Sequence, residues 1–304
     1  MTLLKTNESQ LVKMAVQGKI AYPLRYGAYE IDAEGHAHSL PSVGGITYNV
    51  MVGDPAFGWR GDHIEAGVSV LMDSKDRSSK ESQAFQFLAC VGNEALLVSG
   101  EAKGAKGTVI GHHGGVEHLL VDFDRRVLDK MTYDDKILIR AFGQGLEIAH
   151  APDVKCYNFD PRILKLWGIR ALAKGRLQVP VAMEVPAAIM GSGIGHPDPG
   201  TGDYDITTQD PKAVKRWGLD RIRFGDLIAI RDADNTFGRH YYEGAMTIAV
   251  VVHSDSFLSG HGPGVSTLLS SRKGSLIPVK NQKANIAQIL KIGRHATRLK
   301  RQRA

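Results

Sequence analysis

Short runs of alternating apolar and polar residues, separated by glycine-rich turns, recur along the 304 residues of the chain. Alternation with a period of two is typical of half-buried β-strands, and a continuous apolar, largely β-branched run such as residues 245–252 indicates a buried one. The pattern predicts strands at residues 45–54, 63–72 and 84–91, and several more between 92 and 150. The chain is therefore expected to be mainly β, with a smaller α contribution (α+β).

Residues 92–150 contain the densest group of predicted strands. The turn signals KGAKG, GHHGG and YDDK divide them, and KGTVIGHHGGVEHLLVDF has the pattern of a hairpin. This spacing is similar to that of SH3-like barrels, in which a GxVxG strand precedes one that ends in an acidic and an aromatic residue. We therefore expect a small SH3-like barrel combined with a larger β-rich domain at residues 151–280. Residues 1–91 are expected to be a β segment that packs with the larger domain.

Two segments are expected to be helical. In DPRILKLWGI, Asp160 is a suitable N-cap, Pro161 fits the first helical position and Gly168 ends the helix. Nearer the C-terminus, apolar residues between 286 and 296 recur at helical spacing, with Lys and Arg on the other face. This pattern predicts an amphipathic basic helix in a tail at residues 281–304.

The positive charge of the chain is concentrated near the C-terminus, in this tail and the residues just before it. Ten of the 38 Lys and Arg residues lie at residues 272–304, which contain no Asp or Glu. The rest of the chain contains the other 28 basic residues and all 32 acidic residues. It therefore has a net charge of −4, although the whole chain has a net charge of +6. A basic tail can contact nucleic acid, an anionic membrane or an acidic neighbour, and the alternative is a solvated helix.

The remaining composition is that of an ordinary globular protein, with 43% hydrophobic and 23% charged residues. No apolar run approaches the roughly 20 residues of a membrane span, and the N-terminus lacks the apolar core of a signal peptide. Cys90 and Cys156 stand far from any CxxC pattern, which predicts two reduced thiols. We therefore expect a cytoplasmic protein without membrane contact.

The predicted strand at residues 245–252 leads into a loop with reactive side chains, HSDSFLSGHGPG. A histidine at the end of a strand can face a cleft, and the glycines around His261 allow a ligand to approach the backbone. Imidazole is a common zinc ligand and a common general base. His253, Asp255 and His261 are therefore candidates for metal binding or proton transfer. The alternative is structural histidines in a glycine-rich turn.

A second group of candidates lies in NVMVGDPAFGWRGDHIEAG, residues 49–67. Asp54 and the pair Asp62–His63 flank a loop that contains glycine and proline, and such loops at strand ends often form clefts. The pair is expected to supply two metal ligands, or a carboxylate that orients a neighbouring imidazole. The alternative is aspartates that cap backbone N–H groups in turns.

The third group lies in MGSGIGHPDPGTGDYDITT, residues 190–208. GSGIG is not a dinucleotide-binding fingerprint, because the proline- and glycine-rich residues that follow cannot form the required helix. Its backbone is a candidate nest for an oxyanion. Asp203 and Asp205 are two residues apart and are candidates for a metal ligand or a general base. The alternative is a long surface loop.

Three further histidines, His112, His113 and His118, lie in GHHGGVEH. The first two coincide with an apparent hairpin turn. We interpret this turn as structural, with a contribution to a cleft as the alternative.

Three strings carry a resemblance to a known family. GDYDITT, residues 218–264 and GGITYNVMVGDPAFGWRGDHIEAGVSV together resemble a family of uncharacterised bacterial and archaeal proteins, a domain of unknown function, over residues 12–280. This resemblance implies a small SH3-like barrel combined with a larger β-rich domain, and it supplies no settled activity. A more distant similarity, carried by GDLIAI and SGHGPG, is to acetamidases and formamidases, which are β-rich, metal-dependent amide hydrolases. No complete ligand set aligns with them.

Together these observations predict a metal-dependent hydrolase that uses a metal-activated water on a small amide-like or cyclic amide substrate. Its divalent metal, with zinc as the first choice, is expected to be held by Asp62, His63 and His253. The catalytic candidates are His261, Asp255 and Asp54. Backbone N–H groups in the two glycine-rich loops are expected to stabilise an oxyanion, at Gly191, Ser192, Gly193, Gly260 and Gly262.

Two other classes of protein stay open at this point. One is a nucleic-acid-binding module that uses the barrel and the basic tail, although the acidic remainder of the chain and the lack of interleaved aromatic residues weigh against it. The other is a binder of small molecules without catalysis. A homo-oligomer is expected in each case.

Overall fold

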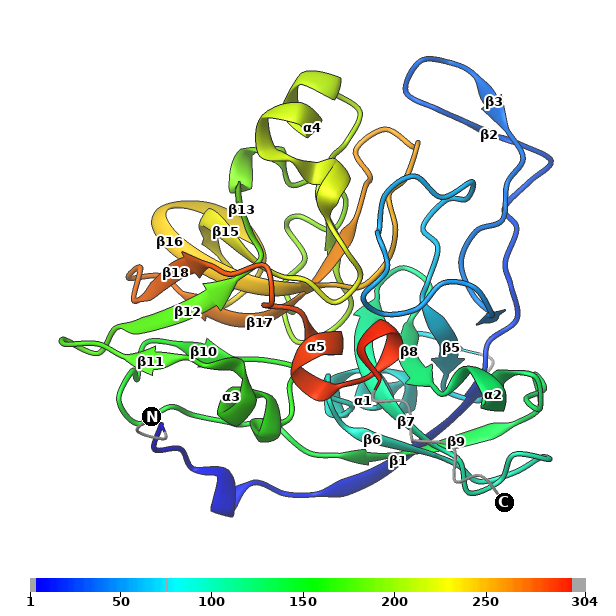
Figure 1. Ribbon diagram of the computed structural model, residues 1–304, viewed down its shortest axis with the longest axis horizontal. Helices are drawn as coiled ribbons and strands as arrows, with labels where there is room; N and C mark the ends of the chain where they lie inside the picture. Colours follow the sequence, from blue (N-terminus) through cyan, green and yellow to red (C-terminus); the bar gives the residue numbers. More distant parts are fainter. Residues whose placement is uncertain (1–3, 75, 297–304) are drawn as a thin grey trace, which may run out of the picture.

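The structure is a computed structural model that describes residues 4–74 and 76–296. Strands dominate it, and its helices are short (Figure 1). A small closed barrel of six strands lies beside a larger body built on a second sheet. The prediction of a mainly β fold that contains a small barrel is therefore confirmed.

The barrel draws strands from two parts of the sequence. Its order is β1 (Met14–Ile20), β9 (Lys136–Ala141), β6 (Glu94–Leu97), β7 (Lys106–His113), β8 (His118–Phe123) and β5 (Gly67–Leu71). β1 pairs with both β9 and β5, which closes the ring. The first and last strands of the order, β1 and β5, therefore have no open edge. The two-residue strand β4 (Ile46–Thr47) extends β5. The segment at residues 92–150 thus supplies β6 to β9, and β1 and β5 come from the N-terminal segment.

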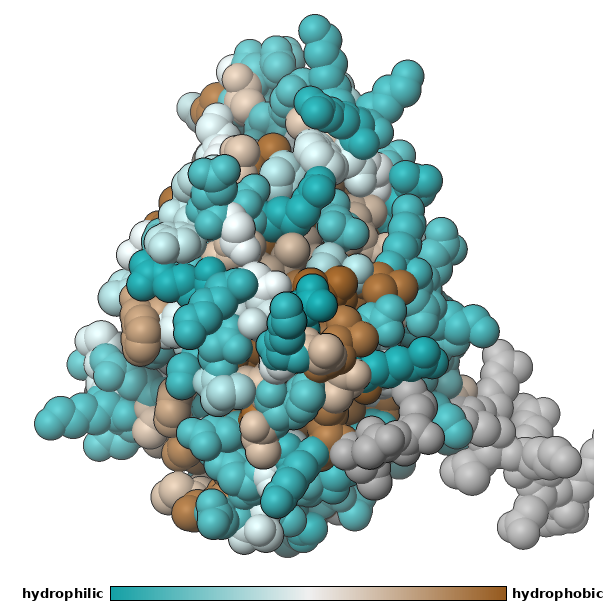
Figure 2. Space-filling view, turned by 90° about the vertical axis from the view of Figure 1, so that its left-hand side faces the viewer, coloured by the Kyte–Doolittle hydropathy of each residue, from teal (hydrophilic) through white to brown (hydrophobic). Residues whose placement is uncertain are grey.

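The larger body is built on a second sheet, seen in the left and centre of Figure 1. Its order is β10 (Lys155–Cys156), β17 (Gly264–Ser271), β16 (His240–Val251), β15 (Leu227–Asp234) and β13 (Met183–Pro186), and β14 (Tyr204–Asp205) also pairs with β17. Two small sheets complete the strands: β11 (Arg170–Ala171), β12 (Leu177–Val181) and β18 (Leu276–Lys280) form one, and β2 (Glu30–Ile31) and β3 (Ala37–His38) the other. The side of the molecule on the left of Figure 1 is largely hydrophilic, with hydrophobic residues gathered near its centre (Figure 2).

The barrel and the larger body are in direct contact. β7 has a β-bulge between Val109 and Gly111, and a Cβ atom at Gly111 would lie 2.2 Å from the side chain of Val252, just after β16. Only glycine permits this close approach. A bridge between Glu65, just before β5, and His253 joins the two parts again. The ends of β7 and β16 are therefore held side by side, and this contact positions the site described below.

The helices are short and lie at the surface of the sheets. They are α1 (Lys80–Leu88), α2 (Arg125–Leu128), α3 (Pro161–Trp167), α4 (Pro211–Trp217) and α5 (Ile286–Leu290), with 3-10 turns η1 (Glu8–Gln10), η2 (Ala187–Ile189), η3 (Leu219–Arg221) and η4 (Gly293–His295). The helix predicted from DPRILKLWGI is confirmed as α3: the Asp160 side chain accepts a hydrogen bond from the N–H of Arg162, and Gly168 ends the helix in a left-handed conformation. Within the described residues, no helix is long and apolar enough to cross a membrane.

Two predicted strands differ from the structure. Of residues 45–54, only Ile46–Thr47 form a strand, and the rest are bends and turns. The second difference is larger. Residues 84–91 were expected to be extended, and residues up to Leu88 belong instead to α1. Ser79 caps this helix by accepting a hydrogen bond from the N–H of Ser82, a signal that lies upstream of the apolar run. Phe85, which is buried, packs into the barrel core from the helix. The apolar pattern of this segment is compatible with a strand or a helix. The N-cap and the packing of Phe85 favour the helix.

The predicted C-terminal helix is not confirmed. α5 contains only five residues, Lys291 turns the chain with a left-handed φ of 57°, and η4 follows. Residues 297–304, the last third of the predicted basic tail, lie outside the described residues. Nucleic-acid binding through this tail therefore stays a prediction.

Asp122 in β8 connects the barrel to the C-terminal segment. Its side chain is 7% exposed and accepts a hydrogen bond from the backbone N–H of Gly293, with an oxygen–nitrogen distance of 3.1 Å. Burial raises the pKa of Asp122 to about 7. Since this value lies above the unfolded pKa of about 4, neutral Asp122 contributes stability that is present below about pH 4 and is lost as the pH rises to about 7.

We therefore expect Asp122→Asn to raise the free energy of unfolding by up to about 4 kcal/mol at pH 8, with a smaller gain at pH 5. Asparagine keeps an acceptor for Gly293 and carries no charge. Urea unfolding at the two pH values measures the difference. The control is Asp124→Asn at the exposed neighbour, which should change stability by less than about 0.5 kcal/mol. An equal effect of Asp122→Asn at both pH values would contradict the raised pKa of Asp122.

Candidate metal centre

Four histidines and two aspartates meet where the barrel contacts the larger sheet. All are buried except His261, which is half-buried. We call this group the histidine–aspartate cluster: His63, His113, Asp203, Asp205, His253 and His261.

The bridge between the N-terminal segment and the end of β16 places His63 beside His253. Ser254 donates its backbone N–H to the carbonyl of Ile64, at 2.9 Å, and the Ser254 side chain accepts the N–H of Ile64, at 2.8 Å. The backbone at His63 takes a left-handed φ of 49°, which is uncommon for a residue other than glycine. The rings of His63 and His253 then lie 4.8 Å apart, centre to centre.

Strand pairing brings the other members to the same place. β14 pairs with the start of β17, with Asp205 opposite Gly264, so that Asp205 lies beside His261 in the preceding loop. His113 is the last residue of β7, and its ring stacks on His253 with 4.2 Å between ring centres. Four segments that are far apart in the sequence thus supply the cluster.

The first triad consists of His63, Asp205 and His261. Oδ2 of Asp205 lies 2.9 Å from Nδ1 of His261 and 3.5 Å from Nε2 of His63. The two ring nitrogens are 3.0 Å apart. Two nitrogens and a carboxylate oxygen that converge on one point are a typical donor set for zinc and similar divalent ions.

The second triad consists of His113, Asp203 and His253. Nε2 of His253 lies 2.9 Å from Oδ2 of Asp203 and 3.4 Å from Oδ1 of Asp205. Neither Nε2 of His253 nor Oδ2 of Asp203 has an aligned hydrogen-bond partner, although both atoms are buried. Buried polar atoms are normally satisfied, so these two atoms, which lie against each other, are candidates to share a ligand.

Each of three imidazoles is held from behind by an oxygen. Nδ1 of His63 lies 2.5 Å from Asp62, Nδ1 of His113 lies 2.5 Å from Glu65, and Nδ1 of His253 lies 2.8 Å from the carbonyl of Ser254. An oxygen at Nδ1 fixes the tautomer and leaves the Nε2 lone pair free to bind a metal, which is the usual arrangement around metal-ligating histidines.

The charges of the site control its pKa values. Burial acts to raise the pKa of Glu65, but His118 and His113 outweigh it and hold this pKa well below its usual range. Burial acts to lower the pKa of His253, but Asp203 and Asp205 outweigh it and raise this pKa well above its usual range. The carboxylates are therefore ionised and demand positive charge at the centre of the cluster.

The cluster forms one wall of a cavity of about 310 Å³. His63, His113, His261 and both aspartates line it, together with residues of the 192–202 loop and the turn after β7. This volume is at the lower end of the range for small-molecule sites. The site therefore combines candidate metal ligands with room for a small substrate.

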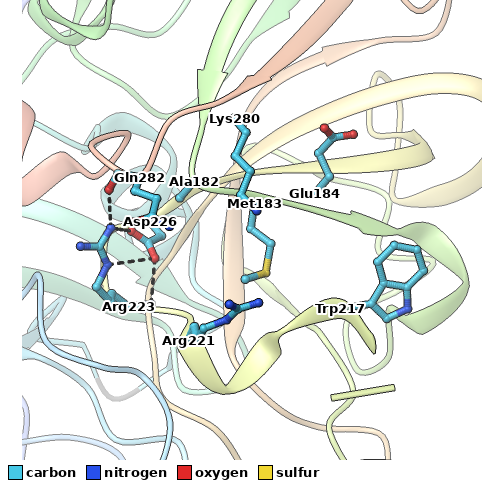
Figure 3. Close-up of a pocket in the computed structure, with 9 residues that line it drawn as sticks. All are labelled: Ala182, Met183, Glu184, Trp217, Arg221, Arg223, Asp226, Lys280 and Gln282. Atoms are coloured by element: carbon cyan, nitrogen blue, oxygen red, sulfur yellow. Dashed lines mark hydrogen bonds and ion pairs between the residues drawn. The ribbon is translucent and has the colours of Figure 1, made fainter. Parts of the chain in front are cut away.

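A second cavity of about 420 Å³ lies elsewhere in the larger body (Figure 3). Of its two acids, Asp226 is paired with Arg223, at 2.8 Å, and Glu184 lies 3.8 Å from Arg231. No member of the histidine–aspartate cluster lines this cavity. The smaller cavity is the better candidate for chemistry because its wall carries convergent titratable groups.

The fold and the site define a β-rich protein with a small barrel and a cluster of histidines and aspartates that could hold a metal ion. The chain belongs to the family described as DUF4438, a domain of unknown function. The model of the N-terminal domain of this family matches residues 29–165, and that of the C-terminal domain matches residues 166–290. The family resemblance predicted from the sequence is confirmed.

The chain is also similar to a solved crystal structure, that of TM1086. The two share 42% sequence identity and a TM-score of 0.89, over 94% of this chain and 99% of the other. No curated protein matches the chain. The similarity to acetamidases and formamidases thus stays a prediction.

The structure places two of the three predicted metal ligands, His63 and His253, inside the cluster. Asp62 contacts Nδ1 of His63 from behind and accepts hydrogen bonds from the side chain of Ser256 and the N–H of Phe257. It therefore orients a ligand from outside the cluster.

The three predicted catalytic residues lie in three different surroundings. His261 is in the first triad, 2.9 Å from Asp205. Asp255 accepts a hydrogen bond from the Thr208 hydroxyl, at 2.5 Å, and lines a separate hollow. Asp54 pairs with Arg294, with 2.9 Å between Oδ2 and Nη2, and caps the N–H of Met51. Only His261 is thus brought to the cavity.

The predicted oxyanion loops border the cavity in part. Ser192 and Gly193 line it. However, Gly191 donates its N–H to the carbonyl of Asp205 and Ser192 donates its own to the carbonyl of Gly260, both at 2.8 Å. The N–H of Gly262 points at Oδ2 of Asp205, at 3.4 Å. These N–H groups hold the loops and the aspartate in place.

Sequence reasoning underestimated three members of the cluster and missed one outer residue. His113 is not in a hairpin turn but at the end of β7, because the β-bulge lengthens this strand by one residue. Asp203 and Asp205 were secondary candidates, and both are ligand candidates in the structure. Glu65 was not singled out. Its spacing of two residues from His63, at the start of a strand, is the one signal for it.

Proposed function

We propose that this protein is a divalent-metal-dependent hydrolase that cleaves a small amide or cyclic amide. One observation carries the proposal: imidazole nitrogens and carboxylate oxygens converge at the wall of a cavity, and oxygens behind the imidazoles fix their tautomers. The set of nitrogen and oxygen donors suits zinc.

The first triad leaves an open side toward the cavity, since His63, Asp205 and His261 all line it. Three protein ligands and an open position are the usual arrangement of a catalytic zinc site. A bound divalent ion would lower the pKa of a water molecule to about 7 and polarise a carbonyl group. His63, Asp205 and His261 would hold the ion at the cavity wall, where the water molecule and the carbonyl group of the substrate can meet.

The cavity favours an uncharged substrate. Among the described residues that line it, Arg239 is the only Lys or Arg. Its two terminal nitrogens already donate to the carbonyls of Asp203 and Thr201, which leaves fewer of its five N–H groups for a phosphate or carboxylate group. A neutral carbonyl compound that fits about 310 Å³ matches this surface better than an anion does.

Glu117 is the candidate proton carrier. It lines the cavity, and burial raises the pKa of its carboxyl group, as suits a general acid. In the reaction, the water oxygen forms a bond to the carbonyl carbon and the carbon–nitrogen bond breaks. Glu117 transfers the water proton to the leaving nitrogen, and the products are a carboxylic acid and an amine.

The test combines metal analysis with a panel of small amides and lactams. We expect near-stoichiometric divalent metal, and turnover that is lost on chelation and restored by zinc. Glu117→Gln should keep the metal and lower kcat by roughly 10²- to 10⁴-fold. A protein that binds neither zinc nor manganese would exclude the proposal. Bound metal and bound ligand without turnover of any panel member would instead favour a non-catalytic binder.

A further inference from the structure

We infer that the histidine–aspartate cluster holds two divalent ions, one in each triad, with Asp205 as the carboxylate between them. The inference deepens the proposed function and rests on the same site. It assigns a second metal position, at His113, Asp203 and His253.

Asp205 presents one oxygen to each triad. Its Oδ2 lies 2.9 Å from His261, and its Oδ1 lies 3.4 Å from Nε2 of His253. A carboxylate whose two oxygens face two separate donor groups is placed to bridge two ions. Ions in two-metal sites lie about 3.5–4 Å apart. The ring centres of His63 and His253, one from each triad, are 4.8 Å apart, so the two donor groups are direct neighbours.

Buried charge also favours two ions over one. Four buried carboxylates belong to the cluster or contact its histidines: Asp62, Glu65, Asp203 and Asp205. Buried charges require partners or metal ions, and two divalent ions supply four positive charges. A single ion in the first triad would leave Asp203 with only His253 and the N–H of Gly114 as partners.

The second triad has its own signs of an absent ligand. Nε2 of His253 and Oδ2 of Asp203 are among the buried atoms without aligned hydrogen bonds, and they lie 2.9 Å from each other. A Cβ atom at Gly264 would lie 2.0 Å from the former and 2.1 Å from the latter. Any side chain at this position would therefore collide with both atoms, and glycine keeps the space around them open. If Asp203 and His253 only supported the first triad from outside, no open space around these two atoms would be needed.

The test is the metal content of the full chain after chelator treatment and reloading with Mn²⁺. We expect two ions per chain by plasma mass spectrometry and an electron paramagnetic resonance spectrum of magnetically coupled Mn²⁺. Asp203→Asn removes the charge of the second triad and keeps the shape, so it should retain one ion and lose the coupling. His261→Ala, at the half-buried member of the first triad, should also retain one ion.

A matched control is Asp232→Asn in the β15–β16 hairpin, which should keep both ions. Circular dichroism and thermal unfolding establish that each variant is folded. One uncoupled ion in the wild type at saturating Mn²⁺, or two ions retained in folded Asp203→Asn, would overturn the inference. A wild type with one ion and amide turnover would overturn the inference alone, whereas two coupled ions without turnover would overturn only the proposed hydrolase function.

Discussion

Replacement of both His63 and His253 by alanine is expected to reduce bound metal to less than about a tenth of the wild-type content and to lower turnover by at least about 10³-fold. The two residues belong to different triads. In each, an oxygen at Nδ1 fixes the tautomer of the imidazole and leaves Nε2 free to bind a metal. Their joint loss removes one ligand from each candidate ion and leaves Asp203 and Asp205 without an imidazole partner at His253. Plasma mass spectrometry after dialysis measures the metal, and the amide panel measures turnover.

The control for this double variant is His36→Ala together with His38→Ala. Both histidines contact Asp32 near the surface, away from the cluster, so their replacement should leave metal content and turnover unchanged. Because His253 is fully buried, circular dichroism must show that the double variant is folded. Full metal occupancy in a folded His63/His253 variant would mean that the ligands lie elsewhere.

Local sequence signals predicted those parts of the fold in which neighbours in the sequence are neighbours in space. The β15–β16 hairpin and α3 follow directly from alternation and from capping residues. The barrel was only partly predictable, because the pairing of β1 with both β9 and β5 joins residues that are 50 or more positions apart. No periodicity within β1 identifies its partners.

The contrast between local signals and long-range pairing also explains which residues of the site could be predicted from the sequence. His63 and His253 each follow a local cue, a histidine at the boundary of a predicted strand. Asp205 had a weaker cue, and its importance comes from the pairing of β14 with β17, which places it between His261 and His253. Its role is therefore a property of the tertiary structure.

Aspartates that look equivalent in the sequence separate in the same way. Asp54 and Asp62 both follow glycine in a turn, yet Asp62 faces His63 whereas Asp54 faces Arg294, which is 240 positions away in the sequence. Asp255 adjoins His253 by two positions, but its side chain turns to Thr208. The partner of each carboxylate decides its function, and for Asp54 and Asp255 that partner is distant in the sequence.

Glu65→Gln is expected to weaken metal binding by about 10- to 100-fold and to lower the free energy of unfolding by about 3 kcal/mol at pH 7. Glu65 accepts hydrogen bonds from His113 and His118, and its Oε2 also accepts from the Ser69 hydroxyl, at 2.5 Å, and the N–H of Gly44, at 2.8 Å. Glutamine has one acceptor oxygen in place of two and turns an NH₂ group toward donors. It also loses the negative charge that increases the basicity of His113 as a ligand.

The pH dependence separates this charge effect from a defect in packing. Because the folded pKa of Glu65 lies well below its usual value, the ionised side chain contributes stability above an unfolded pKa of about 4, and this contribution is lost as the pH falls through the folded pKa. The deficit of Glu65→Gln should thus be largest at neutral pH and shrink in acid. Urea unfolding of chelator-treated protein measures stability without metal, and competition with a chromophoric chelator measures affinity.

Glu184→Gln is the matched control for this substitution. Glu184 is partly exposed and lies 3.8 Å from Arg231 in a loose ion pair, so its neutralisation should change stability by less than about 0.5 kcal/mol and leave metal affinity unchanged. Unaltered metal affinity in folded Glu65→Gln would show that His113 does not act as a ligand supported by this carboxylate. A deficit in stability that is independent of pH would instead assign to Glu65 a role in packing alone, because only the charged form accepts hydrogen bonds with both oxygens.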